Sequence, residues 1–504
     1  MPFIVPFKNA VKNKLGFSVV KNYQLIASAL FIVLLSNCAS ILEPDLAKIK
    51  SEKFYTPAQL RADLNFFNRA IREVHPEPFS RLDRNRYEDS FEQLYIETSW
   101  PQRRRDFFRN IAPLVSSLSD IHTRVLYPTQ EQKKFFETEG RFPLAVLYSS
   151  EGMIVVADQQ STPLVPIGAM LVSINKINID IILDTFKNYV PAETATGQRR
   201  MIQMEFANLL WSVYELEGDF EVEFIWQNQH HLRQIKGIKN KTSEQANPTV
   251  SHYGLLSVDP YTSLLWLNDF NEDYDKFEEF LDYHFNELVE QNKDNLILDL
   301  RYNQGGITDN LALLLTYLTS KPINWATKAT LKLSEEFRDQ HGLMLNNAKN
   351  QKYGNYLDWL PVEYLNFWQW EILFTDDGEL LETKIKTVVS EKEHHFSGNI
   401  IVLSNGYCFS ACASLIATLE NNNLATVIGE SPGSLTNVQY GYPVEVELPN
   451  TGLKVIIPAM RFVLENSNVL SDTALVPEYE VERFRLDVLL GRDPVFDFAM
   501  ELLR

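Results

Sequence analysis

The chain has 504 residues, too many for a single hydrophobic core, so two to four domains are expected. Hydrophobic residues make up 45% and aromatic residues 12% of the sequence, which argues against a largely disordered protein. The net charge of −19 and the scattered basic residues argue against nucleic-acid binding, which needs a clustered cationic face.

The first 38 residues have the pattern of an export signal. Four lysines, the last of them Lys21, precede a short apolar run at 25–36 that is typical of a secretory signal and too short to span a bilayer comfortably. The run ends at Cys38 in a sequence, LSNC, that resembles the lipobox of bacterial lipoproteins, although Asn37 replaces the usual small residue. We predict a bacterial cell-envelope protein, periplasmic or attached to the outer membrane through a lipid on Cys38. A plain signal peptide or an uncleaved anchor is the alternative.

Residues 51–128 are predicted to form a small helical cap domain. The segment 56–60, TPAQL, is typical of a helix start, and apolar residues then recur at helical spacing as far as Pro76. Two more helices are expected around 86–97 and 101–118.

Residues 141–237 change to short strands and resemble a PDZ domain. A strand at 170–174, a tight turn at 175–176 and a helix after Asp180 have the expected order. PDZ domains bind a peptide as an added strand. A peptide-binding loop is predicted just before the first strand, without the glycines usual there, at Phe142, Pro143 and Leu144. A PDZ-like brace between domains is the alternative.

Two segments of the last predicted domain, residues 250–490, carry the candidate chemistry. Segments 295–306 and 399–417 each begin as an apolar run typical of a buried parallel strand and then change to polar and small residues. Ligands bind outside the carboxyl ends of the strands in open α/β sheets. The Gly305-Gly306 pair and Ser410, which follow these runs, are therefore candidate site residues.

Ser410 is the predicted nucleophile. It opens a helix whose N-terminus offers unpaired N–H groups, so the N–H of Ala411 is one expected oxyanion donor. Gly305 and Gly306 let the backbone approach a substrate closely, and an N–H there is the second. A serine that only caps the helix is the alternative.

Two cysteines, Cys408 and Cys412, flank Ser410. A disulfide between them would be strained, and no cluster of further ligands accompanies them. They are predicted to be buried packing residues, and neither a metal nor a cofactor is expected.

These motifs resemble the carboxyl-terminal processing peptidases, a serine peptidase family that includes the tail-specific proteases and the tricorn core. The family pattern Asp-Leu-Arg-x-Asn-x-Gly-Gly is matched at 299–306, its Ser-Ala pair at 410–411, and its Val-Ile-Gly-Glu strand at 427–430. The resemblance covers about residues 51–490. It implies an α/β fold with a crotonase-like catalytic domain of stacked ββα units, beside the PDZ-like and helical cap domains.

The general base distinguishes two versions of this family. Tail-specific members use a lysine, but Leu435 stands at its position here. Tricorn-type members take a histidine from a pattern like Leu-x-Asp-x-His-Thr, which residues 118–123 match, so the resemblance implies His122 as the base. An ordinary histidine pKa of about 6.5 suits proton abstraction at neutral pH. A histidine that caps the end of a helix is the alternative.

The acid that orients this histidine is expected late in the chain, as in tricorn-type members. Asp472 is the nearest match and Glu465 the next. Asp120, close to His122 in sequence, is predicted to be a turn or cap residue.

The sequence therefore predicts an exported serine endopeptidase that acts on polypeptides, with no oligomeric state specified. One alternative is a peptide-binding scaffold that kept the fold and lost catalysis, because the lysine is missing. A second is another acyl-transfer reaction on the crotonase-like fold, which no CoA-binding feature supports.

Overall fold

The computed structural model describes residues 53–239, 252–340, 372, 375–390, 392, 394–465 and 474–504. Contacts between residues divide the chain into a short unit, 1–54, and a large unit, 55–504, which holds the site. The predicted signal segment with its Cys38 and the predicted acid Asp472 lie outside the described residues. None of the helices in the described ranges is long and apolar enough to cross a membrane.

The helical region, residues 57–116, consists of α3 (Pro57–Val74), α4 (Arg84–Glu97) and α5 (Arg104–Ser116). Thr56 and Gln59 form a capping box at the start of α3, where two N–H groups of the first turn need acceptors. The face of α3 that packs into the core carries fully buried apolar side chains at helical spacing: Leu60, Leu64, Phe67, Ile71 and Val74. The three predicted helices are confirmed. The short strands β1 (Phe54–Tyr55) and β2 (Gln102–Arg103) precede α3 and α5 in the chain.

The antiparallel region, residues 144–236, is a sheet with strand order β4-β5-β6-β8-β9. Its strands are β4 (Leu144–Ser149), β5 (Gly152–Asp158), β6 (Met170–Ile174), β7 (Ile177–Asn178), β8 (Asp219–Trp226) and β9 (Gln229–Lys236). Between β7 and β8 lie α7 (Ile179–Phe186) and α8 (Ala195–Tyr214), and α6 (Thr129–Thr138) precedes the region. Asn175 and Lys176 both have positive φ, which confirms the tight turn predicted after β6.

A six-stranded sheet with order β10-β11-β12-β15-β16-β19 forms the centre of the mixed region, residues 253–504. Its strands are β10 (Tyr253–Ser257), β11 (Thr262–Leu267), β12 (Asn295–Asp299), β15 (Asn399–Ser404), β16 (Thr426–Gly429) and β19 (Tyr479–Glu480). All except β10 run parallel to their neighbours. In β12 and β15, Asn295 pairs with Asn399 and Asp299 with Leu403. The two predicted strands are therefore confirmed, and their carboxyl ends meet at one edge.

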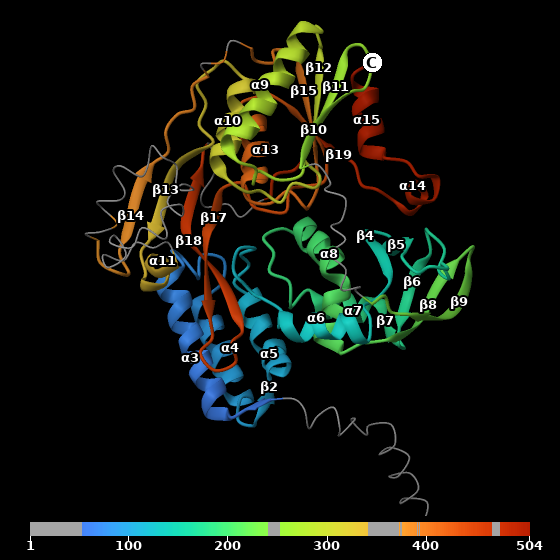
Figure 1. The fold of residues 1–504 in the computed structure, drawn as a ribbon, viewed down its shortest axis with the longest axis vertical. Helices are drawn as coiled ribbons and strands as arrows, with labels where there is room; N and C mark the ends of the chain where they lie inside the picture. Colours follow the sequence, from blue (N-terminus) through green and yellow to red (C-terminus); the bar gives the residue numbers. More distant parts are fainter. Residues whose placement is uncertain are drawn as a thin grey trace, which may run out of the picture. The chain divides into compact units, whose positions relative to one another are not determined.

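Helices cover both faces of this sheet (Figure 1). Leu296 and Leu298 of β12 belong to the large core shared with α9 (Tyr274–Glu290), α10 (Thr308–Leu318) and α13 (Ala411–Asn421). Ile297, which points to the opposite face, packs in a smaller cluster with α15 (Pro494–Leu502). A strand that is buried on both faces has a continuous run of apolar residues, and this run is why β12 could be predicted from the sequence. The short helix α14 (Arg485–Leu490) connects β19 to α15.

A second sheet, with order β14-β13-β18-β17, joins the mixed region to the helical region. Its strands are β13 (Ala326–Lys332), β14 (Leu380–Lys384), β17 (Val438–Glu447) and β18 (Lys454–Leu464), and the short helix α11 (Glu335–Gln340) follows β13. The hairpin of β17 and β18 extends onto α3, where Asp63 accepts hydrogen bonds from Asn450 and Thr451 (Figure 1). The short strand β3 (Arg124–Val125) pairs with β18. This pairing brings the segment after His122 to the mixed region.

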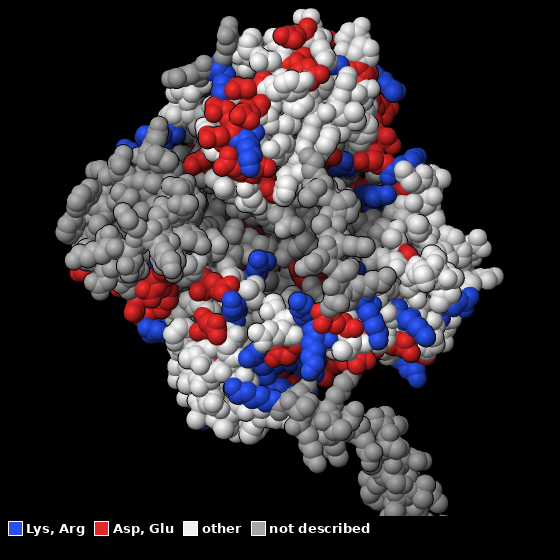
Figure 2. All heavy atoms as spheres, viewed as in Figure 1, with Lys and Arg blue, Asp and Glu red and all other residues white. Residues whose placement is uncertain are grey.

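Charges of both signs are interspersed over the helical region in the face that Figure 2 shows. Three arginines of this region, Arg103, Arg105 and Arg109, lie within 3.1 Å of the carboxylate of Glu215. The basic residues of this cluster are thus paired with an acid rather than left as a cationic face.

Candidate active site

Ser410 lies in a strained turn between β15 and α13. Its φ of 52° falls in the left-handed region, which costs a residue with a Cβ about 1–3 kcal/mol. Its N–H donates to Oγ of Ser434, at 3.0 Å, which holds the turn in place. Its own side chain makes no helix-capping hydrogen bond, so the alternative of a serine that only caps the helix is wrong. Ser410 is partly exposed, beyond the carboxyl end of β15 in the parallel sheet.

Gly305 packs directly against Ser410. A Cβ at Gly305 would lie 2.8 Å from Cβ of Ser410 and 3.1 Å from N of Ala411, so glycine is needed for this close approach. The N–H of Gly305 is already donated to Oδ1 of Asn303, at 2.8 Å. The N–H groups of Gly306 and Ala411 donate to no other described residue. These two N–H groups are therefore free to bind an oxyanion.

The two cysteines near Ser410 are free and fully buried, which confirms the packing role predicted for them. Sγ of Cys408 lies 3.1 Å from the carbonyl oxygen of Leu300, and Sγ of Cys412 lies 3.9 Å from the same oxygen. Burial raises the pKa of the Cys412 thiol well above its ordinary value, so it stays protonated. Cys408, in the loop before α13, and Cys412, in the first turn of α13, thus both contact the residue that follows β12.

His122 lies in a turn between α5 and β3. Helix α5 ends at Ser116, so His122 does not cap it, and that alternative is wrong. Oδ1 of Asp120 accepts the His122 N–H at 3.0 Å, and Oδ2 accepts the hydroxyl of Thr123 at 2.5 Å. These bonds fix the backbone of the turn, and the imidazole remains 18% exposed.

Asp120 is the carboxylate that faces this imidazole. Its Oδ1 lies 3.4 Å from Nδ1 of His122, and its Oδ2 lies 3.3 Å from Nε2 of His75. Burial alone would raise the pKa of Asp120, but interactions with the two neighbouring histidines outweigh burial and hold the pKa well below its ordinary value. Asp120 does form the predicted turn, and its carboxylate also lies beside the His122 imidazole.

Glu465, predicted as a possible orienting acid, makes a different contact. Its Oε1 accepts a hydrogen bond from Nδ2 of Asn324, at 3.1 Å. Among the described residues, the carboxylates of Asp120 and Glu193 lie close to His122.

Glu193 and Arg81 form a buried ion pair beside His122 that the sequence analysis missed. Oε1 of Glu193 lies 3.2 Å from Nη1 of Arg81, and the Glu193 side chain is fully buried. Burial raises the pKa of Glu193, although the positive charge of Arg81 opposes this shift. Ligand atoms of Asp120, His122 and Glu193 lie within 4.8 Å of one another, a spacing that could hold a metal ion. Because the Arg81 guanidinium already supplies a positive charge next to Glu193, the cluster is better suited to proton transfer than to binding a metal ion.

Two consecutive residues connect this cluster to Ser410. Ser434 accepts the N–H of Ser410, and Leu435 donates its N–H to Oε2 of Glu193, at 2.9 Å. The side chain of Leu435, at the position of the family lysine, is buried and offers no base. Hydrogen bonds through residues 434–435 therefore link Ser410 to Glu193, whose carboxylate lies within 4.8 Å of His122, although 288 positions separate the serine and the histidine in the sequence numbering.

The residues predicted to bind a peptide in the antiparallel region are buried. Phe142 packs edge-on against Phe206 and Phe220, with ring centroids 5.6 and 5.1 Å apart. Leu144 is 5% exposed, and the carbonyl of Pro143 accepts the N–H of Gln159. These side chains belong to the core and are not available to a peptide.

A strained serine with a glycine packed against it, at the carboxyl edge of a parallel α/β sheet, defines the class as a serine hydrolase. Comparison supports this class: residues 262–481 match the model of Peptidase family S41, and this similarity supports a serine peptidase. This match does not support the alternative of an inactive scaffold. A search of the curated proteins finds no match.

Solved structures share this fold. Mature CPAF complexed with lactacystin aligns over 88% of this chain and 97% of that chain, with 16% identity and a TM-score of 0.63. Mature CPAF aligns over 86% of this chain and 94% of that chain, with 17% identity and a TM-score of 0.60. At such identities the likeness concerns the fold alone.

Proposed function

We propose that this protein is a serine endopeptidase in which Ser410 is the nucleophile and His122 the general base. The observation that carries the proposal is the left-handed turn at Ser410. In this turn Gly305 packs closely against the serine, and the N–H of Ala411 has no acceptor among the described residues. A strained, held nucleophile beside unengaged N–H groups is what acyl transfer requires.

The reaction would proceed in two acyl-transfer steps. Because Asp120 lies next to Nδ1 of His122, Nε2 is the nitrogen left to accept the proton of the Ser410 hydroxyl. The oxygen attacks the peptide carbonyl, and the N–H groups of Gly306 and Ala411 stabilise the oxyanion. His122 returns its proton to the leaving amine. Water then hydrolyses the acyl-enzyme by the same route, while ionised Asp120 stabilises the imidazolium at each step.

We also propose the finer architecture that the family resemblance implies: a helical cap, a PDZ-like domain at 141–237 and a crotonase-like catalytic domain. The turn at Asn175 and Lys176 and the helix α7 after it support the PDZ-like assignment. Since Phe142 is buried, we infer that this domain acts as a brace. It contacts the catalytic loop directly, because Oγ1 of Thr194 donates to the carbonyl of Pro432 at 3.0 Å.

Export and a lipid anchor at Cys38 are our proposal for the N-terminal segment. The support is the lysine-rich start, the apolar run at 25–36 and the cysteine that follows it. Fractionation of cells that produce the wild type or Cys38→Ala tests it: the wild type should stay with membranes and the variant should become soluble. Identical distribution of the two proteins would contradict the anchor.

The catalytic proposal is tested with an unfolded protein such as casein as the substrate. Ser410→Ala should lower kcat by at least about 10⁴-fold, because the nucleophile is lost. His122→Ala should lower kcat by about 10²–10⁴-fold at neutral pH, because the base is lost. A fluorophosphonate probe should label the wild type and fail to label Ser410→Ala.

The matched control is Ser90→Ala, which removes an exposed hydroxyl bonded to the carbonyl of Arg86 on α4. This variant should keep full activity and full labelling. Full proteolysis by Ser410→Ala, or by His122→Ala at neutral pH, would show that the assignment is wrong.

A further inference from the structure

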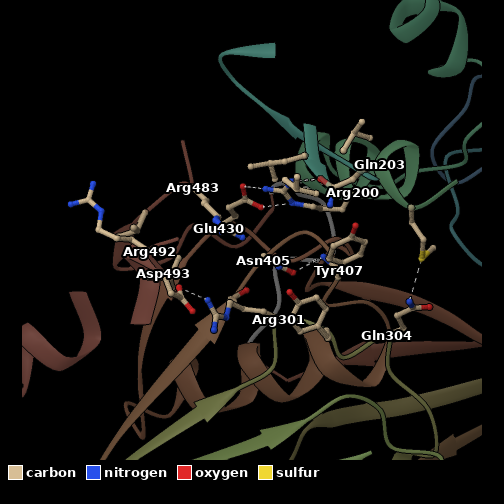
Figure 3. Close-up of a pocket in the computed structure, with 18 of the residues that line it drawn as sticks. Arg200, Gln203, Arg301, Gln304, Asn405, Tyr407, Glu430, Arg483, Arg492 and Asp493 are labelled. Carbon is tan, nitrogen blue, oxygen red and sulfur yellow. Dashed lines mark hydrogen bonds and ion pairs between the residues drawn. The ribbon is translucent and has the colours of Figure 1, made fainter. Parts of the chain in front are cut away.

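A pocket of about 680 Å³ opens at the carboxyl edge of the parallel sheet (Figure 3). One wall comes from the segments that follow β12, β15, β16 and β19, and the opposite wall comes from β4, β5 and α8. Its volume is within the range of ordinary ligand sites, about 300–1,000 Å³. The pocket contains none of the residues placed in the catalytic reaction above.

The charged residues that line this pocket are mainly arginines. Four arginines and two carboxylates line it, an excess of two positive charges in a chain whose net charge is −19. Two of the arginines are held by acids: Arg200 pairs with Glu430, and Arg301 binds Asp493 at 2.7 Å (Figure 3). These pairs fix the walls of the pocket.

The other two arginines are accessible. Arg492 is half exposed and has one ion pair, at 2.9 Å to Asp487. Arg483 is exposed, and its guanidinium makes no hydrogen bond or ion pair with a described residue, although its charge acts on the Asp493 carboxylate of the same pocket. A guanidinium offers a planar fork of donors that matches a carboxylate. The lining therefore has a free donor set for one anionic group.

The pocket adjoins the catalytic loops. Gln304, on its wall, precedes the Gly305 that packs against Ser410, and Tyr407, also on its wall, precedes Ser410 by three positions. The rings of Tyr302 and Tyr407 stack with centroids 6.4 Å apart. Because residues close to Gly305 and Ser410 in the sequence line this pocket, an extended peptide, which advances about 3.3 Å per residue, can run from the scissile bond towards it.

We propose that this pocket is a substrate subsite that binds a carboxylate of the polypeptide, with Arg483 as its principal contact. The carboxylate comes from an acidic side chain or from the carboxyl terminus of the substrate. The apolar side chains of Val146, Leu147 and Val156 on the opposite wall contact the aliphatic part of that residue. This inference rests on the proposed peptidase function, because it concerns the preference of that same site.

The test measures peptide binding by titration calorimetry to the Ser410→Ala protein, which cannot cleave its ligand. The probes are (Ala-Glu)₄ and (Ala-Gln)₄, each with a free and with an amidated carboxyl terminus. A probe with a carboxylate should bind about three- to fivefold tighter than amidated (Ala-Gln)₄. The difference should shrink in 0.5 M NaCl, because salt screens exposed charges.

The second variant is Arg483→Gln in the Ser410→Ala background, which should abolish this preference. Arg233→Gln is the matched control, since Arg233 is exposed on β9 and lies outside the pocket. Preference for amidated (Ala-Glu)₄ assigns the site to an acidic side chain, and preference for (Ala-Gln)₄ with a free terminus assigns it to a terminal carboxylate.

Equal binding of all four probes, or a preference that survives Arg483→Gln, would overturn the proposal. Binding here does not depend on catalysis. Failure of the peptidase assignment would therefore appear separately, as wild-type protein that does not cleave casein.

Discussion

Asp120 connects two histidines that lie far apart in the sequence. One of its oxygens faces His122 and the other faces His75, and its side chain is only 3% exposed. The low pKa of this carboxyl keeps it ionised at neutral pH. In the proposed mechanism, an ionised acid next to His122 would stabilise the imidazolium that forms when Ser410 loses its proton.

Asp120→Asn should therefore lower kcat about 100-fold or more at neutral pH while the fold is kept, because the amide preserves size but removes charge.

The free energy of unfolding of the wild-type protein should also depend on pH through Asp120. The folded pKa lies below the ordinary 3.8, so the carboxylate contributes stability that is complete above the unfolded pKa and is lost as pH falls through the folded pKa. Urea unfolding at pH 6 and at a series of pH values from 3.5 downwards measures this loss, which the variant should lack.

Asp63→Asn is the control for Asp120→Asn. Asp63 is also fully buried in the helical region, where it accepts hydrogen bonds from Asn450 and Thr451. Its replacement should cost stability but leave kcat unchanged. Equal losses of kcat in the two variants would mean that Asp120 acts only through the fold.

Local motifs predicted some site residues and missed others. Ser410, Ala411 and the glycine pair sit where a strand ends, so short-range pattern was enough to find them. Glu193 and Arg81 were missed, because a buried ion pair in loops has no periodic signal in sequence. The pattern around His122 contains Asp120, but the sequence indicated only a turn residue there and not a carboxylate that faces the imidazole.

Among the helices and strands, the sequence predicted those whose local apolar pattern matches their burial in the fold. The strands β12 and β15 were recognisable because both of their faces are buried, and α3 because its cap and its apolar spacing agree. The hairpin of β17 and β18 was not predicted to reach the helical region. Its contact with Asp63 joins residues 387 positions apart, and no local pattern encodes such a pairing.

Whole regions of the molecule must come together to assemble the site. The helical region and the turn after it supply Arg81 and Asp120, the loop before α8 supplies Glu193 and Thr194, and the mixed region supplies Ser410. Thr194 connects the last two regions, because its hydroxyl donates to the carbonyl of Pro432 at 3.0 Å and accepts the N–H of Gly197 at 3.0 Å. Ser434 and Leu435 follow Pro432 closely in the same loop.

Thr194→Val should lower kcat about tenfold, since a loss of about 1.4 kcal/mol of correct positioning corresponds to that factor. It also removes the cap of α8, which costs about 1 kcal/mol of stability. Thr56→Val is the matched control, because Thr56 caps α3 in the same way. It should cost comparable stability and leave kcat unchanged, whereas Thr194→Ser should restore the wild-type kcat. If both valine variants have the wild-type kcat, Thr194 is only a helix cap, and the antiparallel region does not position the catalytic loop.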